Sequence, residues 1–365
     1  MTPAETQALK NRCTRWVSGF APRSFADELE AVAAWARSNG ISADVYGEGG
    51  AVELLEQRVA GLLGKPAAVF MPSGVMAQLI ALRLHADDQR LPRFGMHATC
   101  HLATEEEQAF SHVMGLHATY LGQAHRTLTR RDLEQPAEAL SAVVLELPAR
   151  VIGGQSPSWE ELAAIKQWAA EKGTRLHLDG ARLWEAAAWY GKSYAEIAAG
   201  ADTVYVSTYK GLGGFSGALL AGDERAMAQA RVWRRRLGGT IFQLAPLAAS
   251  AAYRLDERLA LMPRLFERTV AVVEALSRVS GIRINPAAPH ANMFHVHMDG
   301  EVQRLIGARN AIAENDGFWL FNAARATGSP GRAVAEIYVG DNLLAIDDDA
   351  VVEAFSRLIA LANSE

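Results

Sequence analysis

The chain has 365 residues, of which 50% are hydrophobic and 21% are charged, as in ordinary globular proteins. Its length suits a large domain with a smaller one better than a single small domain. The formal net charge is −5 and no long basic run is present, which argues against a nucleic-acid partner. No stretch approaches about 18 uninterrupted apolar residues, which argues against a membrane span.

Cysteine content and the N-terminus indicate the compartment. Cys13 and Cys100 are the two cysteines, so a disulfide framework is not expected and a reducing compartment fits. Neither cysteine lies in a CxxC or Cys/His pattern, and no metal site is predicted. The N-terminal residues MTPAETQALKNRCTRW lack the apolar stretch of a signal peptide, so we expect a cytoplasmic protein.

Strands and helices alternate from residue 51 to residue 221. After a helix at 51–64, short apolar runs predict buried strands at Ala67–Met71, Ala142–Leu147, Arg175–Asp179, Thr203–Ser207 and Gly217–Ala221. Helices are expected from Gly74 to about His85, over Glu160–Lys172 and over Ala181–Tyr190. The alternation predicts an α/β fold in which helices cover both faces of a mostly parallel sheet.

The pattern changes near residue 255. A long helix at roughly 243–262 precedes predicted strands at Met293–Met298 and Val334–Val339 and helices at about 301–314 and 347–362. We therefore expect three parts. These are an N-terminal segment (1–40) that packs on the core, a large domain (41–255) and a smaller C-terminal α+β domain (256–365).

Polar residues follow three of the predicted strands. Ser73-Gly74 comes after the first strand, Asp179 ends the strand that begins at Arg175, and Lys210 lies just past Thr203–Ser207. Ligands of open α/β sheets bind at the carboxyl ends of the strands, so these residues are expected to meet at one edge. Taken singly, Asp179 could cap the next helix, and Lys210 could be a surface residue.

Together these residues match the needs of pyridoxal 5′-phosphate (PLP). A lysine amine must form a Schiff base, and Lys210 in STYKGLGG suits that role. A carboxylate must keep the pyridine nitrogen protonated, and Asp179 in HLDGAR suits it. The helix that begins after Ser73 offers backbone amides for the phosphate.

Six segments carry a resemblance to a known family. They are DVYGEGG (44–50), FMPSGVMAQ (70–78), HATCHLATEEE (97–107), HLDGARLWEA (177–186), STYKGLGG (207–214) and WRRRLGGTIFQ (233–243). In this order they resemble the threonine aldolase and aromatic amino acid β-eliminating lyase family, a group of fold type I PLP enzymes. The resemblance implies a large domain with a mostly parallel, seven-stranded sheet and a smaller C-terminal domain.

The resemblance also implies a role for each matching residue. Lys210 is the implied Schiff-base lysine and Asp179 the partner of the pyridine nitrogen. Arg182 would hold the cofactor's ring hydroxyl or the substrate carboxylate, and His101 would stack on the ring and move a proton. Four residues complete the expected cofactor contacts within the subunit: Ser73, Gly74, Val75 and Ser207.

Two further contacts are implied to come from a neighbouring subunit. Tyr46 and an arginine of the 234–236 group, represented by Arg235, would reach the partner's phosphate. The resemblance therefore implies a homodimer or homotetramer with shared active sites and a small amino-acid substrate. A solvated helix end is the alternative for these arginines, and His97 is the alternative to His101.

The substrate-binding residues depart from the family pattern. The family's histidine after the strand at 142–147 is absent, and Arg150 follows there, either as its replacement or as a carboxylate ligand. Ser18 matches a serine that helps to bind the substrate carboxylate. The C-terminal arginine of the family has no clear match, and Arg332 lies nearby in the sequence.

The resemblance implies cleavage of a β-hydroxy-α-amino acid, such as threonine, to glycine and an aldehyde. Two alternatives stay open: a β-eliminating lyase that acts on another amino acid, and a PLP-binding protein without catalysis. A nucleotide-binding protein is disfavoured, because the sequence contains neither GxGxxG nor GxxxxGK[ST].

Overall fold

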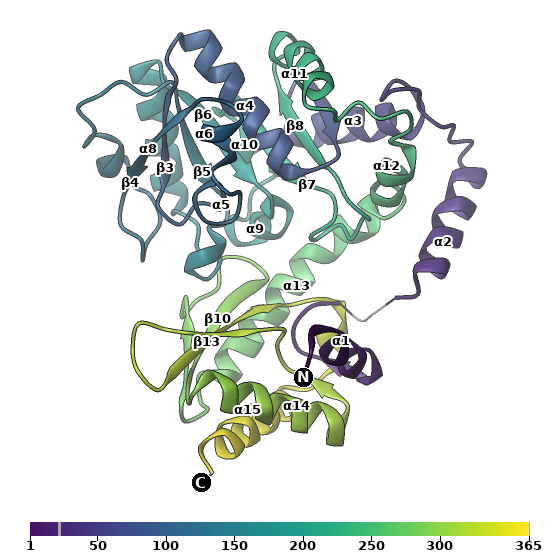
Figure 1. Ribbon diagram of the computed structural model, residues 1–365, viewed down its shortest axis with the longest axis vertical. Coiled ribbons are helices and arrows are strands. Elements are labelled where there is room, and N and C mark those ends of the chain that lie inside the picture. Colours follow the sequence, from purple (N-terminus) through teal and green to yellow (C-terminus); the bar gives the residue numbers. More distant parts are fainter. Residues whose placement is uncertain (21–22, 365) are drawn as a thin grey trace. The chain divides into compact units, whose positions relative to one another are not determined.

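The computed structural model describes residues 1–20 and 23–364, and these form two compact units (Figure 1). The larger unit comprises Phe25–Val151 and Gln155–Ala260, and the smaller unit comprises Met1–Ser24, Ile152–Gly154 and Leu261–Glu365. The expected domains differ from this division mainly at the N-terminus. Residues 21, 22 and 365, which those domains include, lie outside the described residues.

The larger unit is built on a seven-stranded sheet with the strand order β2-β8-β7-β6-β5-β3-β4. The strands are β2 (Ala67–Met71), β3 (Arg93–His97), β4 (His117–Leu121), β5 (Ala142–Glu146), β6 (Arg175–Gly180), β7 (Thr203–Ser207) and β8 (Ala218–Gly222). All neighbouring pairs are parallel except those of β8, which runs antiparallel to both β2 and β7. The predicted α/β fold with a mostly parallel sheet is confirmed.

Helices cover both faces of this sheet. The helices of the larger unit are α2 (Phe25–Ser38), α3 (Gly50–Leu63), α4 (Gly74–Gln89), α5 (His101–Thr104), α6 (Ala109–His112), α7 (Arg130–Leu133), α8 (Trp159–Lys172), α9 (Leu183–Tyr190), α10 (Tyr194–Ala198), α11 (Glu224–Arg236) and α12 (Ala245–Ala252). Val69, Met71 and Tyr205 pack against α4 and α11. Alternate residues of a strand point to opposite faces of the sheet. Helix α3 contacts β2 and β8, but none of its residues belongs to the apolar cluster that Val69, Met71 and Tyr205 form with α4 and α11. Helix α3 therefore covers the other face.

The helix boundaries follow local capping rules. The Ser73 hydroxyl accepts a hydrogen bond from Met76 N at the start of α4, and Ser158 does the same for Glu161 N at the start of α8. Helix α8 ends at Gly173, whose positive φ of 65° is the left-handed conformation that terminates a helix. These caps fix where the chain turns between the helices and the strands.

The smaller unit contains a four-stranded antiparallel sheet of order β12-β13-β10-β9. Its elements are α1 (Pro3–Arg12), β1 (Arg15–Trp16), β9 (Ile282–Asn285), β10 (Met293–Asp299), α14 (Val302–Asp316), β11 (Phe318–Trp319), β12 (Ala324–Ala326), β13 (Arg332–Tyr338) and α15 (Asp348–Asn363). The sheet and helices share one apolar cluster, to which Phe294, Ile337 and Phe355 belong. Helix α13 (Leu255–Leu276) begins in the larger unit and continues into the smaller one.

The N-terminal residues belong to the smaller unit for a structural reason. Strand β1 pairs in parallel with β11, and Leu9 and Cys13 are buried in a cluster with Ala313 and Trp319. Within the N-terminal segment expected at residues 1–40, Phe25–Ser38 forms α2, which belongs to the larger unit.

Two local differences from the sequence analysis concern secondary structure. The single helix expected at 243–262 is two helices, α12 and α13, and the second one continues through Pro263. Strands β3 and β4 were not predicted, because RFGMH and HATYL are not continuous apolar runs and β4 is a partly exposed edge strand. No helix among the described residues is long and apolar enough to cross a bilayer.

Candidate active site

The predicted chemical groups meet at the carboxyl edge of the large sheet. Glu146 is the last residue of β5 and lies opposite Asp179 of β6, which in turn lies opposite Tyr205 of β7. Lys210 follows the end of β7, and α4 begins shortly after the end of β2. Parallel strands bring these ends together, as the sequence analysis expected.

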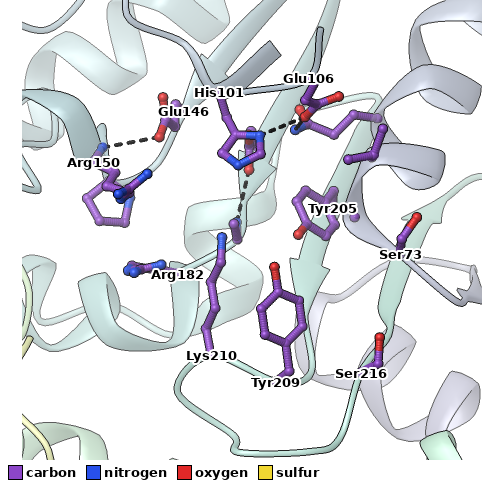
Figure 2. A pocket seen from close by; sticks show the side chains of 16 residues that line it. Ser73, His101, Glu106, Glu146, Arg150, Arg182, Tyr205, Tyr209, Lys210 and Ser216 are labelled. Atoms are coloured by element: carbon purple, nitrogen blue, oxygen red, sulfur yellow. Dashed lines mark hydrogen bonds and ion pairs between the residues drawn. The ribbon is translucent and has the colours of Figure 1, made fainter. Parts of the chain in front are cut away.

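A cavity of about 200 Å³ opens at this edge (Figure 2). Its lining consists of Ser73, Gly74, Val75, Gln78, His101, Glu106, Glu146, Pro148, Arg150, Asp179, Ala181, Arg182, Tyr205, Tyr209, Lys210 and Ser216. All of these residues belong to the larger unit. Eight of the residues singled out in the sequence are among them: Ser73, Gly74, Val75, His101, Arg150, Asp179, Arg182 and Lys210.

The Asp179 carboxylate is fixed by its own turn. The side chain is buried, and Oδ1 accepts a hydrogen bond of 3.1 Å from Ala181 N. A buried carboxylate is costly without cationic or hydrogen-bonding partners. Its position in the cavity wall makes it available to a protonated ring nitrogen.

Lys210 lies in a loop whose two ends are joined by hydrogen bonds. Thr208 Oγ1 donates to Ser216 O at 2.9 Å, and Gly214 N donates to Thr208 O at 2.8 Å. Burial, followed by the positive charge of Arg182, lowers the pKa of Lys210 below its ordinary value. The neutral amine, which is the nucleophilic form, is thereby favoured.

The N-terminus of α4 forms another part of the cavity wall. Ser73 caps the helix, and Gly74 is its first residue. A Cβ atom at Gly74 would lie 2.1 Å from the Tyr205 hydroxyl oxygen, so this position requires glycine. The first amides of the helix carry a partial positive charge that suits an anion such as a phosphate.

His101 is held by a buried carboxylate. Its Nδ1–H donates to Glu106 Oε1 at 2.8 Å, and Gln78 Nε2 donates to the same oxygen at 3.0 Å (Figure 2). The hydrogen bond to Glu106 raises the pKa of His101 above its ordinary value. His97 is instead buried against Thr99 and the Gln123 carbonyl, so of the two candidate histidines the cavity contains His101.

The segment after β5 brings a further ionic group to the cavity. Arg150 N donates to Glu146 Oε1 at 3.1 Å, and Arg150 Nη1 lies 3.6 Å from Glu105 Oε1. Figure 2 shows Glu146 and Arg150 beside one another, on the same side of the cavity as Arg182. Burial, followed by the negative charge of Asp179, raises the pKa of Glu146 to about 7.

Three expected cofactor residues do not line this cavity. Ser207 is buried, and its hydroxyl donates to Ala181 O at 2.9 Å, so it supports the turn after Asp179. Tyr46 and Arg235 are exposed on the larger unit. The neighbouring Arg234 is buried and donates to Phe70 O at 2.8 Å, which makes it a structural residue.

Two expected substrate residues belong to the smaller unit. The buried Ser18 hydroxyl accepts a hydrogen bond of 3.2 Å from Tyr338 N. Arg332, at the start of β13, pairs with Asp299 at 3.1 Å. Both side chains are therefore engaged within that unit, and their roles toward a substrate stay predictions.

Several cavity residues were not predicted from the sequence, namely Gln78, Glu106, Glu146, Tyr205, Tyr209 and Ser216. Glu146 had a visible signal, since it is the second-last residue of the predicted strand Ala142–Leu147, which ends at the same edge as Asp179. Tyr205 and Gln78 had none, because the direction of their side chains depends on sheet register and helix rotation. Among the described residues no group of three or more His, Cys, Asp or Glu is placed to hold a metal ion.

Comparison with known proteins identifies the family. The family model described as "Beta-eliminating lyase" matches residues 36–299, which is more than half of the chain. The chain belongs to the beta-eliminating lyase family. This match covers the seven-stranded sheet and all residues that line the cavity.

Two known proteins resemble the chain over most of its length. Low-specificity L-threonine aldolase 1 of Arabidopsis thaliana is 30% identical over 283 residues, which cover 74% of this chain and 79% of that protein. A crystal structure from Listeria monocytogenes EGD-E, provisionally assigned as an L-allo-threonine aldolase, is 35% identical with a TM-score of 0.90. That match covers 97% of this chain and 99% of the other. The fold is accordingly that of fold type I PLP enzymes.

Proposed function

We propose that this protein is a PLP-dependent lyase that cleaves a β-hydroxy-α-amino acid of the threonine type to glycine and an aldehyde. The observation that carries the proposal is the meeting of Lys210 and Asp179 in one cavity beside the N-terminus of α4. Membership of the beta-eliminating lyase family and a threonine aldolase relative of 30% identity support it.

The groups that line the cavity fit PLP. Lys210 would hold the cofactor covalently, and the buried Asp179 carboxylate would pair with its ring nitrogen. The α4 amides at Gly74 and Val75, with the Ser73 hydroxyl, would receive the phosphate. When bound, PLP would supply an electron sink that stabilises negative charge at Cα of the substrate.

The remaining residues would position the substrate and its protons. Arg182 would hold the ring hydroxyl or the substrate carboxylate, and Arg150 would offer a second cation at the same side of the cavity. Glu106 fixes the orientation of the His101 ring and keeps its proton at Nδ1. Ser18 and Arg332 are proposed as further contacts to the substrate carboxylate.

The proposed assembly is a homodimer or homotetramer in which neighbouring subunits share active sites. The proposed compartment is the cytoplasm. The exposed positions of Tyr46 and Arg235 suit contacts to the phosphate of a neighbouring subunit, whereas the buried Arg234 holds the Tyr46 segment through the Tyr46 carbonyl at 3.4 Å. Ser207 is proposed to support the cofactor site indirectly, because its hydroxyl holds the turn at Ala181 that follows Asp179.

Product analysis tests the proposed function. The PLP-loaded enzyme is incubated with L-threonine, L-allo-threonine and L-phenylserine, and glycine and the matching aldehyde are measured. Glycine from at least one substrate is expected. Pyruvate and ammonia from serine or cysteine without any glycine would establish a β-eliminating lyase, and no product from any amino acid would contradict an enzymatic function.

A second experiment tests the cofactor assignment. Borohydride reduction of the PLP-loaded protein is expected to fix the cofactor to the peptide that contains Lys210, as mass spectrometry would show. The Lys210→Ala variant should bind PLP without fixing it. A cofactor fixed to another lysine would contradict the assignment.

A further inference from the structure

The Glu146 carboxylate has no role in the function proposed so far. It ends β5 directly opposite Asp179, and it lines the cavity with Lys210 and His101. Oε1 accepts the Arg150 backbone N–H at 3.1 Å, which fixes the orientation of the carboxylate (Figure 2). A carboxylate that is fixed and open to a cavity is in a position to exchange a proton with a bound substrate.

The other groups that line the cavity are less suited to accept a proton. Glu106 is fully buried, and its Oε1 accepts hydrogen bonds from both His101 and Gln78. The hydrogen bond to Glu106 raises the pKa of His101, which favours the imidazolium form, and in that form both ring nitrogens already carry a proton. Burial raises the pKa of Tyr209, so the phenol also stays protonated. Asp179 and Lys210 would be engaged with the cofactor.

From this placement we propose that Glu146 is a catalytic residue that removes the proton from the β-hydroxyl group of the substrate. The inference rests on the function proposed above. It assigns the step that a retro-aldol cleavage requires and that the lysine and aspartate do not perform.

The step balances without another reactant. The hydroxyl proton moves to a Glu146 oxygen, and the O–H electron pair forms the second bond of the aldehyde carbonyl. The Cα–Cβ bond breaks, and its electron pair remains at Cα. After the aldehyde leaves, Glu146 releases its proton to water, and Cα takes up one proton to become glycine, so that no net proton is gained or lost.

The ionisation of Glu146 supports this role. Burial and the adjacent Asp179 carboxylate raise the pKa of Glu146 to about 7, so both protonation states are accessible near neutral pH. The ionisable groups close to it are Asp179 of β6, His101 of α5, Cys100 before α5, Arg150 after β5 and Lys210 after β7. Since a base must be deprotonated to act, cleavage is expected to slow as the pH falls through this range.

The test compares Glu146→Gln with Glu107→Gln, which removes an exposed carboxylate from the segment between α5 and α6. In Glu146→Gln, kcat for cleavage should fall by about 10²–10³-fold, with KM changed by less than about 3-fold. The decrease of kcat/KM at acidic pH should disappear. Glu107→Gln should behave as the wild type.

Two controls separate proton removal at the β-hydroxyl from a structural role. Exchange of the glycine α-proton with D2O needs no hydroxyl base, so Glu146→Gln should retain it within about 3-fold. The infrared band of a carboxylic acid that titrates near neutral pH in the wild-type protein should be missing in Glu146→Gln.

Several outcomes would overturn the inference. One is cleavage by Glu146→Gln at more than about a third of the wild-type rate. Another is an equal loss of cleavage and of glycine α-proton exchange, and a third is an unchanged decrease of kcat/KM at acidic pH. These results differ from failure of the proposed function, in which the wild-type enzyme itself releases no glycine from any β-hydroxy amino acid.

Discussion

At the scale of single residues, the cavity shifts proton affinities in the directions that the proposed roles require. Burial and Arg182 lower the pKa of Lys210, which favours the nucleophilic amine. Burial and Asp179 raise the pKa of Glu146, which makes its carboxylate a stronger base than an ordinary glutamate. Perturbed groups of this kind concentrate at functional sites, because catalysis needs proton affinities matched to the working pH.

Gly74 offers a test of how tightly this edge is packed. The Gly74→Ala variant should lower the free energy of unfolding by roughly 1–3 kcal/mol, since the new Cβ meets the Tyr205 hydroxyl at 2.1 Å. Adding Tyr205→Phe removes the hydroxyl oxygen and should recover part of the loss. The recovery should be incomplete, because the ring Cζ would still lie 2.6 Å from the new Cβ. Urea unfolding of the purified variants measures both effects.

Gly61→Ala is the matched control for that experiment. Gly61 lies within α3, and no atom outside its own helix backbone stands within 4 Å of the position that a Cβ atom would take, so alanine should be neutral or stabilising by roughly 0.5–1 kcal/mol. Equal stability of Gly74→Ala and the wild type would contradict the close contact.

At the scale of secondary-structure elements, helix starts and strand ends place the chemistry. Helix α4 directs its first amides into the cavity wall, and the turn after β6 fixes Asp179 through Ala181 N. Helix α11 (Glu224–Arg236) is capped by Asp223, whose Oδ1 accepts a hydrogen bond of 2.7 Å from Ala226 N, and it carries Arg235 in its last turn. Its cap therefore supports the segment that is proposed to reach a neighbouring subunit.

The Asp223 cap leads to a stability prediction. Asp223→Ala should lower the free energy of unfolding by about 1 kcal/mol, because it leaves the Ala226 N–H without its side-chain acceptor. Asp223→Asn should retain most of the stability, since its amide oxygen can accept the same bond. Urea unfolding midpoints of the two variants give the answer, and an equal loss in both would show that the charge matters more than the cap.

The position of a residue within its element decides whether it could be predicted from the sequence. The placement of Lys210 and Asp179 at one edge of the sheet was predictable, because each stands beside an apolar strand and within a specific motif. Strands β3 and β4 were not, because their residues lack the apolar continuity of a buried strand. The Glu106–His101 contact was not predicted, since it depends on a short turn between α5 and α6 rather than on a periodic pattern.

At the scale of the whole molecule, stability depends on buried groups at the opposite edge of the large sheet. His85 Nε2 and His177 Nδ1 lie 2.7 Å and 2.9 Å from Thr203 Oγ1, and both rings are buried. Burial lowers the pKa of His85 to about 4 and that of His177 to about 3. The folded protein thus keeps both rings neutral where an unfolded chain protonates them.

This pair predicts acid sensitivity. The unfolded histidines bind protons below about pH 6.5, so the free energy of unfolding should fall from there toward about pH 4. Each histidine contributes up to about 1.4 kcal/mol per pH unit. His85→Gln should reduce the slope, whereas His117→Gln, at an exposed position, should leave it unchanged. Urea unfolding across this pH range decides, and an unaltered slope in His85→Gln would contradict the assignment.

The proposed sharing of active sites between subunits predicts complementation between inactive chains. Lys210→Ala and Arg235→Ala chains, unfolded together and refolded with PLP, should form mixed dimers with one intact site. An equal mixture should recover about a quarter of the wild-type activity. Lys210→Ala mixed with Asp179→Ala should recover none, because both residues serve the same subunit's site. Equal results from the two mixtures would contradict sharing through Arg235.

The reversed direction of β8 also bears on how the protein can be engineered. Because β7 and β8 are antiparallel, the loop that carries Lys210 leaves the sheet and returns to it at the same edge. Its span is closed by Thr208 and Gly217, whose backbones are hydrogen-bonded at 3.2 Å. Extra residues inserted there would displace the amine from the cavity. The turn at Gly173 lies at the other edge, so a fused domain or new chain termini should be tolerated at that turn.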